Sequence, residues 1–196
     1  MTTNESNAQS PSQETQVLHA GKFLSLKKKG HWEFADRVGV TDAAVIIAVT
    51  AQGRLLLTEQ FRIPVNGPVI ELPAGLAGDI PGEEEEPIEA TAERELMEET
   101  GYTADHFEVL LTGPTSAGLA SELVTLVLAS GLKKVGSGGG HGDENIIVHE
   151  VPLDGAAAWL DERIKAGVLV DPKVFSALYF TSRKSPSPSP TASTRR

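Results

Sequence analysis

The pattern of apolar and polar positions predicts strands in the first half of the chain and helices toward its end. Residues 17–30 and 31–40 alternate partly between apolar and polar side chains, and they predict a short N-terminal antiparallel sheet. The β-branched run at 43–50 predicts a buried strand, and the turn at 51–53 predicts a hairpin with a return strand at 54–61. Other short apolar runs predict strands at 69–72, 123–129 and 146–151.

The clearest helix is predicted at residues 87–100. Pro87 suits the first turn, apolar residues recur every four positions from Ile88, and Gly101 suits the C-cap. Further helices are predicted at 154–167 and 172–182. Strands, one central helix, more strands and then helices are typical of an α/β (α+β) sandwich with a mixed sheet, rather than a regular βαβ repeat.

Composition changes at both ends of the chain. Residues 1–16 are rich in Ser, Gln, Asn and Thr, and residues 183–196 contain a Ser-Pro repeat, so we expect two disordered tails that bury no apolar area. Between them we expect an N-terminal β segment at 17–41 and the main domain at 42–182.

Charge and cysteine content exclude several classes of protein. The chain has 27 Asp and Glu against 17 Lys and Arg, a formal net charge of −10, which disfavours binding to nucleic acid. It has no cysteine, so disulfide scaffolds, thiolate zinc sites and cysteine nucleophiles are excluded. There is no apolar run of the roughly 20 residues that a membrane span needs, and no secretory signal at the N-terminus. We therefore expect a cytoplasmic protein without membrane or nucleic-acid partners.

The predicted central helix places three carboxylates on one face. Glu98 and Glu99 follow Glu95 by three and four residues, and each like-charge pair at that spacing costs about 0.2–0.5 kcal/mol. A hard divalent cation such as Mg²⁺ reverses that cost, because it takes oxygen ligands and bridges to phosphates. The alternative is a solvated acidic face without a ligand.

The segment EPIEATAERELMEETGY, residues 86–102, resembles the Nudix box, the signature of hydrolases that act on a nucleoside diphosphate linked to another group. The family pattern has a glycine where this chain has Ile80. Gly75 is the expected equivalent, which implies an insertion of five residues in the loop before the helix. The run of glutamates at 83–86 leaves the first glutamate of the box ambiguous, and we assign it to Glu86.

The resemblance implies a Nudix-type α/β/α sandwich and a set of oxygen ligands for Mg²⁺, with Mn²⁺ as an alternative. The expected ligands are the carbonyl of Ala74 and the carboxylates of Glu95, Glu98 and Glu99, the last two being counted as catalytic. Arg94 is expected to hold Glu86 or a neighbouring carboxylate and so to orient the ligands.

Residues 17–182 further resemble the ADP-ribose pyrophosphatase branch, through the segments WE at 32–33, EQFR at 59–62, ELPAG at 71–75, PTSAG at 114–118 and DEN at 143–145. Four residues are expected to bind substrate: Trp32, Glu33, Arg37 and Arg62. Trp32 would stack on adenine, or else be a core or interface tryptophan. Arg62 would hold a phosphate or ribose, or else form a surface ion pair, and Arg37 is a weaker candidate of the same kind. In this branch the N-terminal sheet completes the pocket of a second subunit, so a homodimer is expected.

Glu144 is the expected general base. It follows the glycine-rich segment at 136–142, and a mobile loop there would bring its carboxylate to the site. The alternatives are a solvated loop carboxylate and His141 as the base.

Together these features predict hydrolysis of ADP-ribose to AMP and ribose 5-phosphate. The alternatives are another nucleoside diphosphate sugar such as GDP-mannose as the substrate, or a Nudix module that senses a nucleotide without cleaving it.

Overall fold

The computed structural model describes residues 14–184, except residues 41, 79, 81, 83, 84 and 143. Most of both predicted tails therefore lies outside the described residues, as do Asp143, Glu83 and Glu84. The segment with the proposed insertion before Glu86 falls partly in the same gaps.

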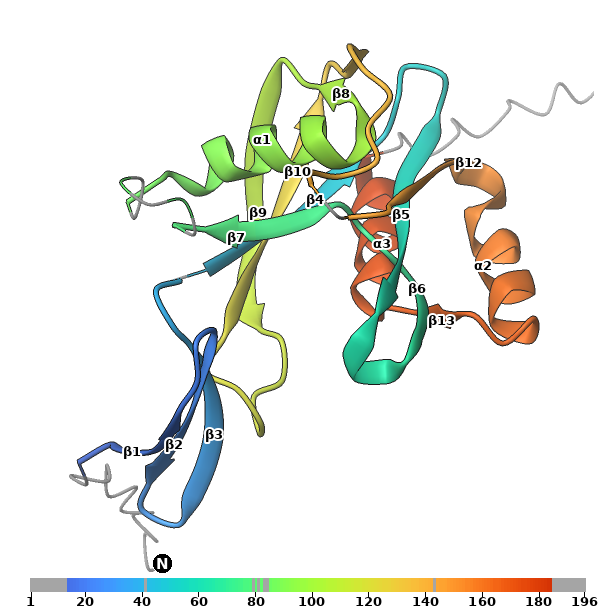
Figure 1. Ribbon diagram of the computed structural model, residues 1–196. Coiled ribbons are helices and arrows are strands. Elements are labelled where there is room, and N and C mark those ends of the chain that lie inside the picture. The colour runs from blue at the N-terminus through green and yellow to red at the C-terminus, as the bar shows by residue number, and fades with distance from the viewer. Residues whose placement is uncertain are drawn as a thin grey trace, which may run out of the picture.

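Within the described residues the main domain contains two four-stranded mixed sheets with helices on either side (Figure 1). The first sheet has the order β7–β4–β10–β9, formed by Ala74–Ala77, Asp42–Ala48, Leu123–Ser130 and His106–Pro114. The second has the order β12–β5–β6–β13, formed by Ile147–Pro152, Arg54–Arg62, Gly67–Glu71 and Leu169–Val170. The helices are α1 (Ile88–Thr100), α2 (Ala156–Lys165) and α3 (Lys173–Lys184), and a two-stranded ladder joins β8 (Tyr102–Thr103) to β11 (Lys133–Lys134). Single 3₁₀ turns lie at Ile63–Val65 and Leu153–Gly155. This arrangement confirms the predicted α/β/α sandwich with mixed sheets.

The apolar run of β4 is explained by burial on both of its faces. Val45 and Ile47 pack into the core between the two sheets, α2 and α3, whereas Ala44 and Ile46 pack into the core beneath α1. Alternate residues of a strand point to opposite faces, so a strand covered on both sides is apolar throughout.

The predicted hairpin between residues 43–50 and 54–61 was wrong beyond its turn. The turn is closed by hydrogen bonds from Gly53 N to Thr50 O at 2.9 Å and from Thr50 N to Arg54 O at 2.8 Å. Past the turn, however, β4 pairs with β7 and β10, and β5 pairs with β6 and β12. The two strands separate into different sheets because both are apolar on two faces and each needs cover on both sides.

Helix α1 begins and ends within one residue of the predicted bounds. Pro87 is its N-cap, and Gly101 adopts the left-handed conformation at φ 73° while its N–H donates to Met97 O at 2.9 Å. Ala92 and Leu96 on its inner face are fully buried. Glu99, three residues after Leu96, is buried as well, at the end of the helix near β7.

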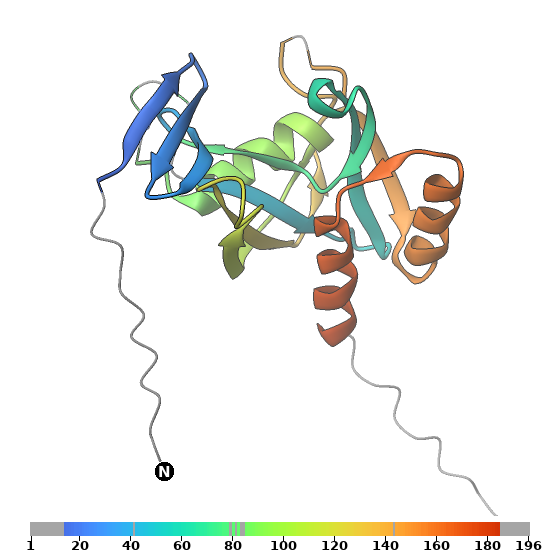
Figure 2. The ribbon, with the colours of Figure 1, turned by 90° about the horizontal axis from the view of Figure 1, so that it is seen from below.

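The predicted N-terminal sheet is present and projects from the main domain (Figures 1 and 2). It consists of β1 (Gln16–Ala20), β2 (Leu24–Lys29) and β3 (Trp32–Arg37), all antiparallel. Strand β3 is joined to the loop after β9 by hydrogen bonds from Ala35 N to Leu119 O at 2.8 Å and from Ser121 N to Ala35 O at 3.0 Å. An ion pair between Arg37 and Glu122 at 2.6 Å adds to this attachment.

Among the described residues no helix has the length and apolar character needed to cross a membrane.

Candidate functional site

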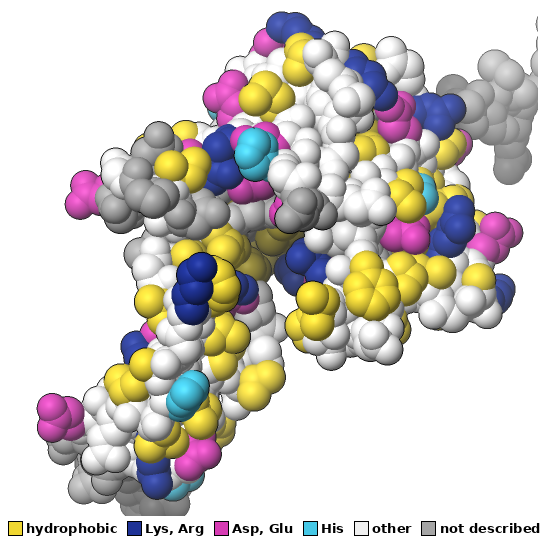
Figure 3. Space-filling view, viewed as in Figure 1, with side chains coloured by type: hydrophobic (Ala, Val, Ile, Leu, Met, Phe, Trp, Pro, Cys, Tyr) yellow, Lys and Arg dark blue, Asp and Glu magenta, His cyan; other side chains and the backbone are white. Residues whose placement is uncertain are grey.

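A cavity of about 610 Å³ opens between β7, the end of α1, the β5–β6 hairpin and the N-terminal sheet. The surface is hollowed between the projecting N-terminal sheet and the body of the domain (Figure 3). The charged side chains lining this cavity come from segments far apart in the chain: Arg37, Arg62, Glu71, Glu95, Glu99, Glu122, Glu144, Asp171 and Lys173. A cavity that combines several carboxylates with three cations suits an anionic ligand that arrives with a metal ion.

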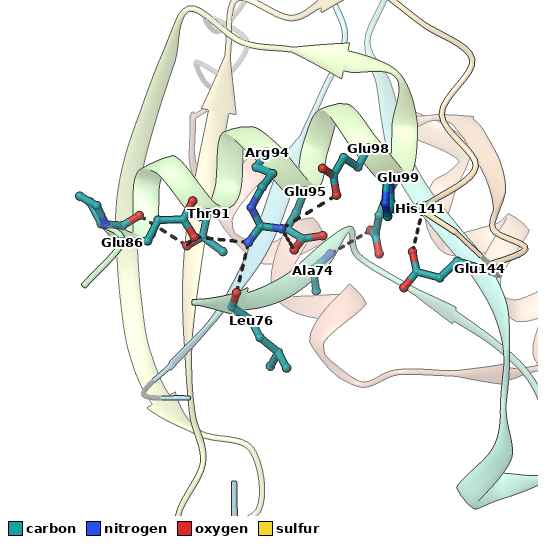
Figure 4. Close-up of polar contacts among 11 residues, drawn as sticks. Ala74, Leu76, Glu86, Thr91, Arg94, Glu95, Glu98, Glu99, His141 and Glu144 are labelled. Carbon is teal, nitrogen blue, oxygen red and sulfur yellow. Dashed lines mark hydrogen bonds and ion pairs between the residues drawn. The ribbon is translucent and has the colours of Figure 1, made fainter. Parts of the chain in front are cut away.

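Glu99 is the most deeply buried acid of the site, with 4% of its surface exposed. One carboxylate oxygen, Oε2, accepts a hydrogen bond from Ala74 N at 3.0 Å, which ties the end of α1 to β7 (Figure 4). Burial, which the Ala74 hydrogen bond opposes, and in second place the charges of Glu95 and Glu144 together raise the pKa of Glu99 to about 8. The nearby Arg62 lowers this pKa only in part. The Glu99 carboxylate therefore lies where additional positive charge would stabilise it.

Glu95 lies directly against β7 because Gly75 has no side chain. A Cβ atom at Gly75 would lie 1.9 Å from Cδ of Glu95 and 2.0 Å from its Oε1. The strand thus leaves room for a carboxylate where any larger residue would displace it. This close approach supports the choice of Gly75 as the equivalent of the box glycine.

Arg94 holds the carboxylates around the helix, as the sequence predicted. Its guanidinium lies 2.6 Å from Glu95 Oε1 and 3.3 Å from Glu86 Oε2, and it donates to the carbonyl of Leu76 on β7 at 3.3 Å (Figure 4). Glu98 is farther from the guanidinium, at 3.9 Å. Glu86 also accepts a hydrogen bond from the hydroxyl of Thr91 at 2.9 Å, so its carboxylate has a fixed position.

The donor set fits a hard divalent cation, although the side chains are not gathered as ligands. Across residues 14–184, outside the gaps named above, no three His, Asp or Glu side chains form a group that could hold a metal ion. Glu95 is held in its ion pair with Arg94. The fit rests on chemistry: the available donors are all oxygens, and Glu95 and Glu144 both act on buried Glu99 as like charges.

Glu144 lies at the edge of the same cavity and also lines a second hollow beside β5, with Glu59, Phe61 and Asn145. Its carboxylate accepts a hydrogen bond from the backbone N–H of His141 at 3.0 Å. The His141 side chain is not among those lining either cavity. The geometry therefore favours Glu144 over His141 as a group that could act on a bound ligand.

Two of the predicted arginines line the central cavity, and each is held by a carboxylate. Arg62 is paired with Glu71, with Nη2 at 2.7 Å and Nε at 2.8 Å from the same oxygen. Arg37, the weaker candidate in the sequence, is paired with Glu122. The alternative of a surface ion pair for Arg62 is thus half right, because the pair exists but lies in the cavity.

Trp32 and Glu33 lie outside the central cavity of this single chain. Trp32 is half exposed on β3, donates from Nε1 to Gly118 O at 3.3 Å, and lines a separate hollow of about 440 Å³. Glu33 is exposed on the same strand. Neither residue is brought to the glutamates of α1 within one copy of the chain.

Sequence reasoning missed Lys173 and Asp171 at the start of α3. Both line the central cavity and form an ion pair at 2.5 Å. They are separated from the Nudix box by about 70 residues and match no motif, so only the packing of α3 beside β6 reveals them.

Comparisons with known proteins show the family to which the chain is similar. The NUDIX domain model matches residues 40–164. A methanol dehydrogenase activator of Bacillus methanolicus is 37% identical over 157 residues, which cover 76% of this chain and 82% of that protein. An ADP-ribose pyrophosphatase of Bacillus subtilis strain 168 is 37% identical over 122 residues, covering 62% of this chain and 63% of that protein. A GDP-mannose pyrophosphatase of Pectobacterium atrosepticum is 35% identical over 134 residues, covering 64% and 66%.

Among solved structures, one described as an ADP compounds hydrolase aligns with a TM-score of 0.64 and covers 87% of this chain and 90% of that one. At 17% identity this likeness supports the fold alone. The extent of the matched family model and the first relative together establish that the chain belongs to the Nudix hydrolase family, as the box at residues 86–102 indicated.

Proposed function

We propose that this Nudix hydrolase cleaves the diphosphate bond of ADP-ribose with the help of Mg²⁺, releasing AMP and ribose 5-phosphate. The observation that carries the proposal is one cavity that is lined both by Glu95 and Glu99 and by Arg62. Relatives named ADP-ribose pyrophosphatase, 37% and 34% identical, support the choice of substrate.

The acidic side of the cavity is assigned to the cation. Glu95, Glu98, Glu99 and the carbonyl of Ala74 would hold it, and Arg94 would orient Glu95 through its ion pair at 2.6 Å. When bound, the cation would neutralise the diphosphate oxygens and make the attacking water more acidic.

The basic side of the cavity is assigned to the substrate. Arg62 is positioned by Glu71 and would donate to a phosphate oxygen or to the terminal ribose. Arg37 and Lys173 line the same cavity and would add positive charge around the anionic substrate. These contacts would hold the diphosphate between the three basic side chains and the end of α1.

Glu144 is assigned the role of general base. Its carboxylate would accept a proton from the water that attacks a diphosphate phosphorus, while the phosphorus–oxygen bond to the departing phosphate breaks. The backbone N–H of His141 would stabilise its negative charge before the proton transfer.

We assign adenine stacking to Trp32 of a second copy of the chain. The N-terminal sheet exposes many apolar side chains, and Trp32 lies outside the cavity of its own chain. A homodimer would cover this apolar surface and bring Trp32 to the partner's cavity. The exposed apolar residues on this sheet are Val17, Leu18, Phe23, Leu24, Leu26 and Trp32.

A nucleotide sugar such as GDP-mannose is the second candidate substrate. It is favoured by relatives named GDP-mannose pyrophosphatase that are 34% to 35% identical. The same carboxylates and arginines would serve either diphosphate. Recognition of the nucleobase and of the terminal sugar would therefore decide which substrate is preferred.

Chromatographic product analysis tests the proposed reaction. The protein is incubated with ADP-ribose, GDP-mannose and NAD⁺, each with Mg²⁺ or with EDTA. We expect AMP and ribose 5-phosphate from ADP-ribose when Mg²⁺ is present and not in EDTA, because neutralising the diphosphate requires the cation. Release of GMP from GDP-mannose as the main reaction would favour the second candidate, and no cleavage with any compound would favour a sensing module.

Replacing the helix glutamates tests the cation site. Glu98→Gln and Glu99→Gln are expected to lower kcat for ADP-ribose about 100-fold or more. Glu99→Gln keeps an acceptor for Ala74 N–H and removes a charge that burial disfavours, so the variant should fold. In a thermal unfolding assay Mg²⁺ should raise the Tm of the wild type more than that of either variant. Glu93→Gln, on the exposed side of α1, is the matched control, and equal activity in all four proteins would contradict the assignment.

Gly75→Ala tests the close approach of Glu95 to β7. The added Cβ would displace the Glu95 carboxylate, so we expect activity to fall about 10- to 100-fold and the Mg²⁺ concentration for half-maximal activity to rise. Gly113→Ala, where an added Cβ meets nothing within 4 Å, is the control. Identical Mg²⁺ titrations for the two variants would remove Glu95 from the cation site.

Mixing two variants with different defects tests the shared pocket. Trp32→Ala is expected to raise KM for ADP-ribose about tenfold or more through lost stacking. If Trp32 serves the partner's cavity, refolding Trp32→Ala with Glu99→Gln creates dimers with one intact site, and activity with the wild-type KM returns. No recovery in mixed dimers verified by mass spectrometry would place Trp32 in the site of its own chain or in none.

A further inference from the structure

The glycine-rich segment before Glu144 is bound to the end of α1. The last carbonyl groups of an α-helix have no partner within the helix and must be satisfied from outside. Here the N–H of Gly139 donates to Glu99 O at 2.8 Å, and the N–H of Gly140 donates to Glu98 O at 3.1 Å. The segment therefore pairs with the backbone of two glutamates at the end of α1, of which Glu99 lines the cavity.

The same segment also controls the position of Glu144. The N–H of Ile146 donates to Gly139 O at 3.1 Å, and the N–H of Glu144 donates to His141 O at 3.2 Å, so the chain turns back on itself. The Glu144 carboxylate then accepts the N–H of His141 at 3.0 Å. Few residues separate the groups bound to α1 from the carboxylate that lines the cavity.

Glycine is required at two places in this contact for steric reasons. At Gly138, with φ 67°, a Cβ atom would lie 2.4 Å from the Thr100 carbonyl carbon and 2.5 Å from Glu99 O. At Gly140, with φ 87°, it would lie 2.7 Å from both Cβ and Oε2 of Glu144. Gly142 has a similar φ of 64°, but a Cβ there meets nothing within 4 Å.

We propose that residues 138–140 are a positioning element that aligns Glu144 with Glu99 by binding the last carbonyls of α1. The proposal rests on the proposed function for the role of Glu144 as the base. The sequence predicted a mobile loop, whereas here the loop is attached to α1. The attachment holds the carboxylates of Glu144 and Glu99 in fixed positions relative to the same end of the helix. Gly140 acts through Glu144 and does not itself touch the substrate.

Amide hydrogen exchange tests the attachment without any measurement of activity. In the full chain, followed by NMR in EDTA, we expect the amide protons of Gly139 and Gly140 to exchange at least about tenfold more slowly than that of exposed Gly142. Equal exchange rates at the three glycines would refute the attachment, whatever the protein cleaves.

Kinetics with ADP-ribose and Mg²⁺ test the positioning role. Gly140→Ala is expected to lower kcat about 10- to 100-fold with KM nearly unchanged, because the added methyl group displaces the Glu144 carboxylate. Gly142→Ala carries the same kind of backbone strain without the collision and should keep kcat within about twofold of the wild type. Equal kcat values for the two variants would overturn the proposal.

A double variant separates positioning from general damage to the fold. If Gly140 acts only through Glu144, adding Gly140→Ala to Glu144→Gln should lower kcat no further. The same loss in both backgrounds would show a merely structural role and refute positioning. A normal kcat for Glu144→Gln alone would instead refute the base assignment in the proposed function, while the exchange rates still decide the attachment.

Discussion

The hydrogen bond between the buried Glu99 carboxylate and the N–H of Ala74 is the interaction on which the site depends. It joins the last turn of α1 to β7 at the place where both border the central cavity. Burial penalises the charge of this carboxylate, and Glu95 and Glu144 add to the penalty. A positively charged ligand at this junction would offset the penalty on the Glu99 carboxylate. The proposed cation would supply that charge.

Each side of the cavity is organised by pairing opposite charges before any ligand binds. Arg94 holds Glu95 and Glu86 on the acidic side, and Glu71 holds Arg62 on the basic side. Such pairs restrict long side chains to a small set of positions, which reduces the entropy lost when a ligand binds. The glycine at position 75 serves the same purpose sterically, since it lets Glu95 lie against the strand.

Local patterns were sufficient to predict α1 and most strands, because a helix stripe and its caps or a short apolar run are properties of neighbouring residues. The hairpin failed because a turn does not determine which partners the following strands choose. Strand β7 at Ala74–Ala77 is not among the predicted strands, since Pro73 and Gly75 disfavour strands in isolation while pairing with β4 stabilises one. Of the site, the glutamates of α1 and Arg94 were predictable from the box, whereas Lys173 carried no signal.

The sequence by itself determined the family, the sandwich class and the carboxylate face of α1, because these depend on residue spacing along one helix and on a motif contained in residues 86–102. Only the tertiary structure decided that Arg37 and Lys173 line one cavity with Glu99, that Trp32 lies outside it, and that the glycine-rich loop binds the end of α1. These relations join segments far apart in the chain, and they follow from how sheets and helices pack, which spacing along the sequence does not specify.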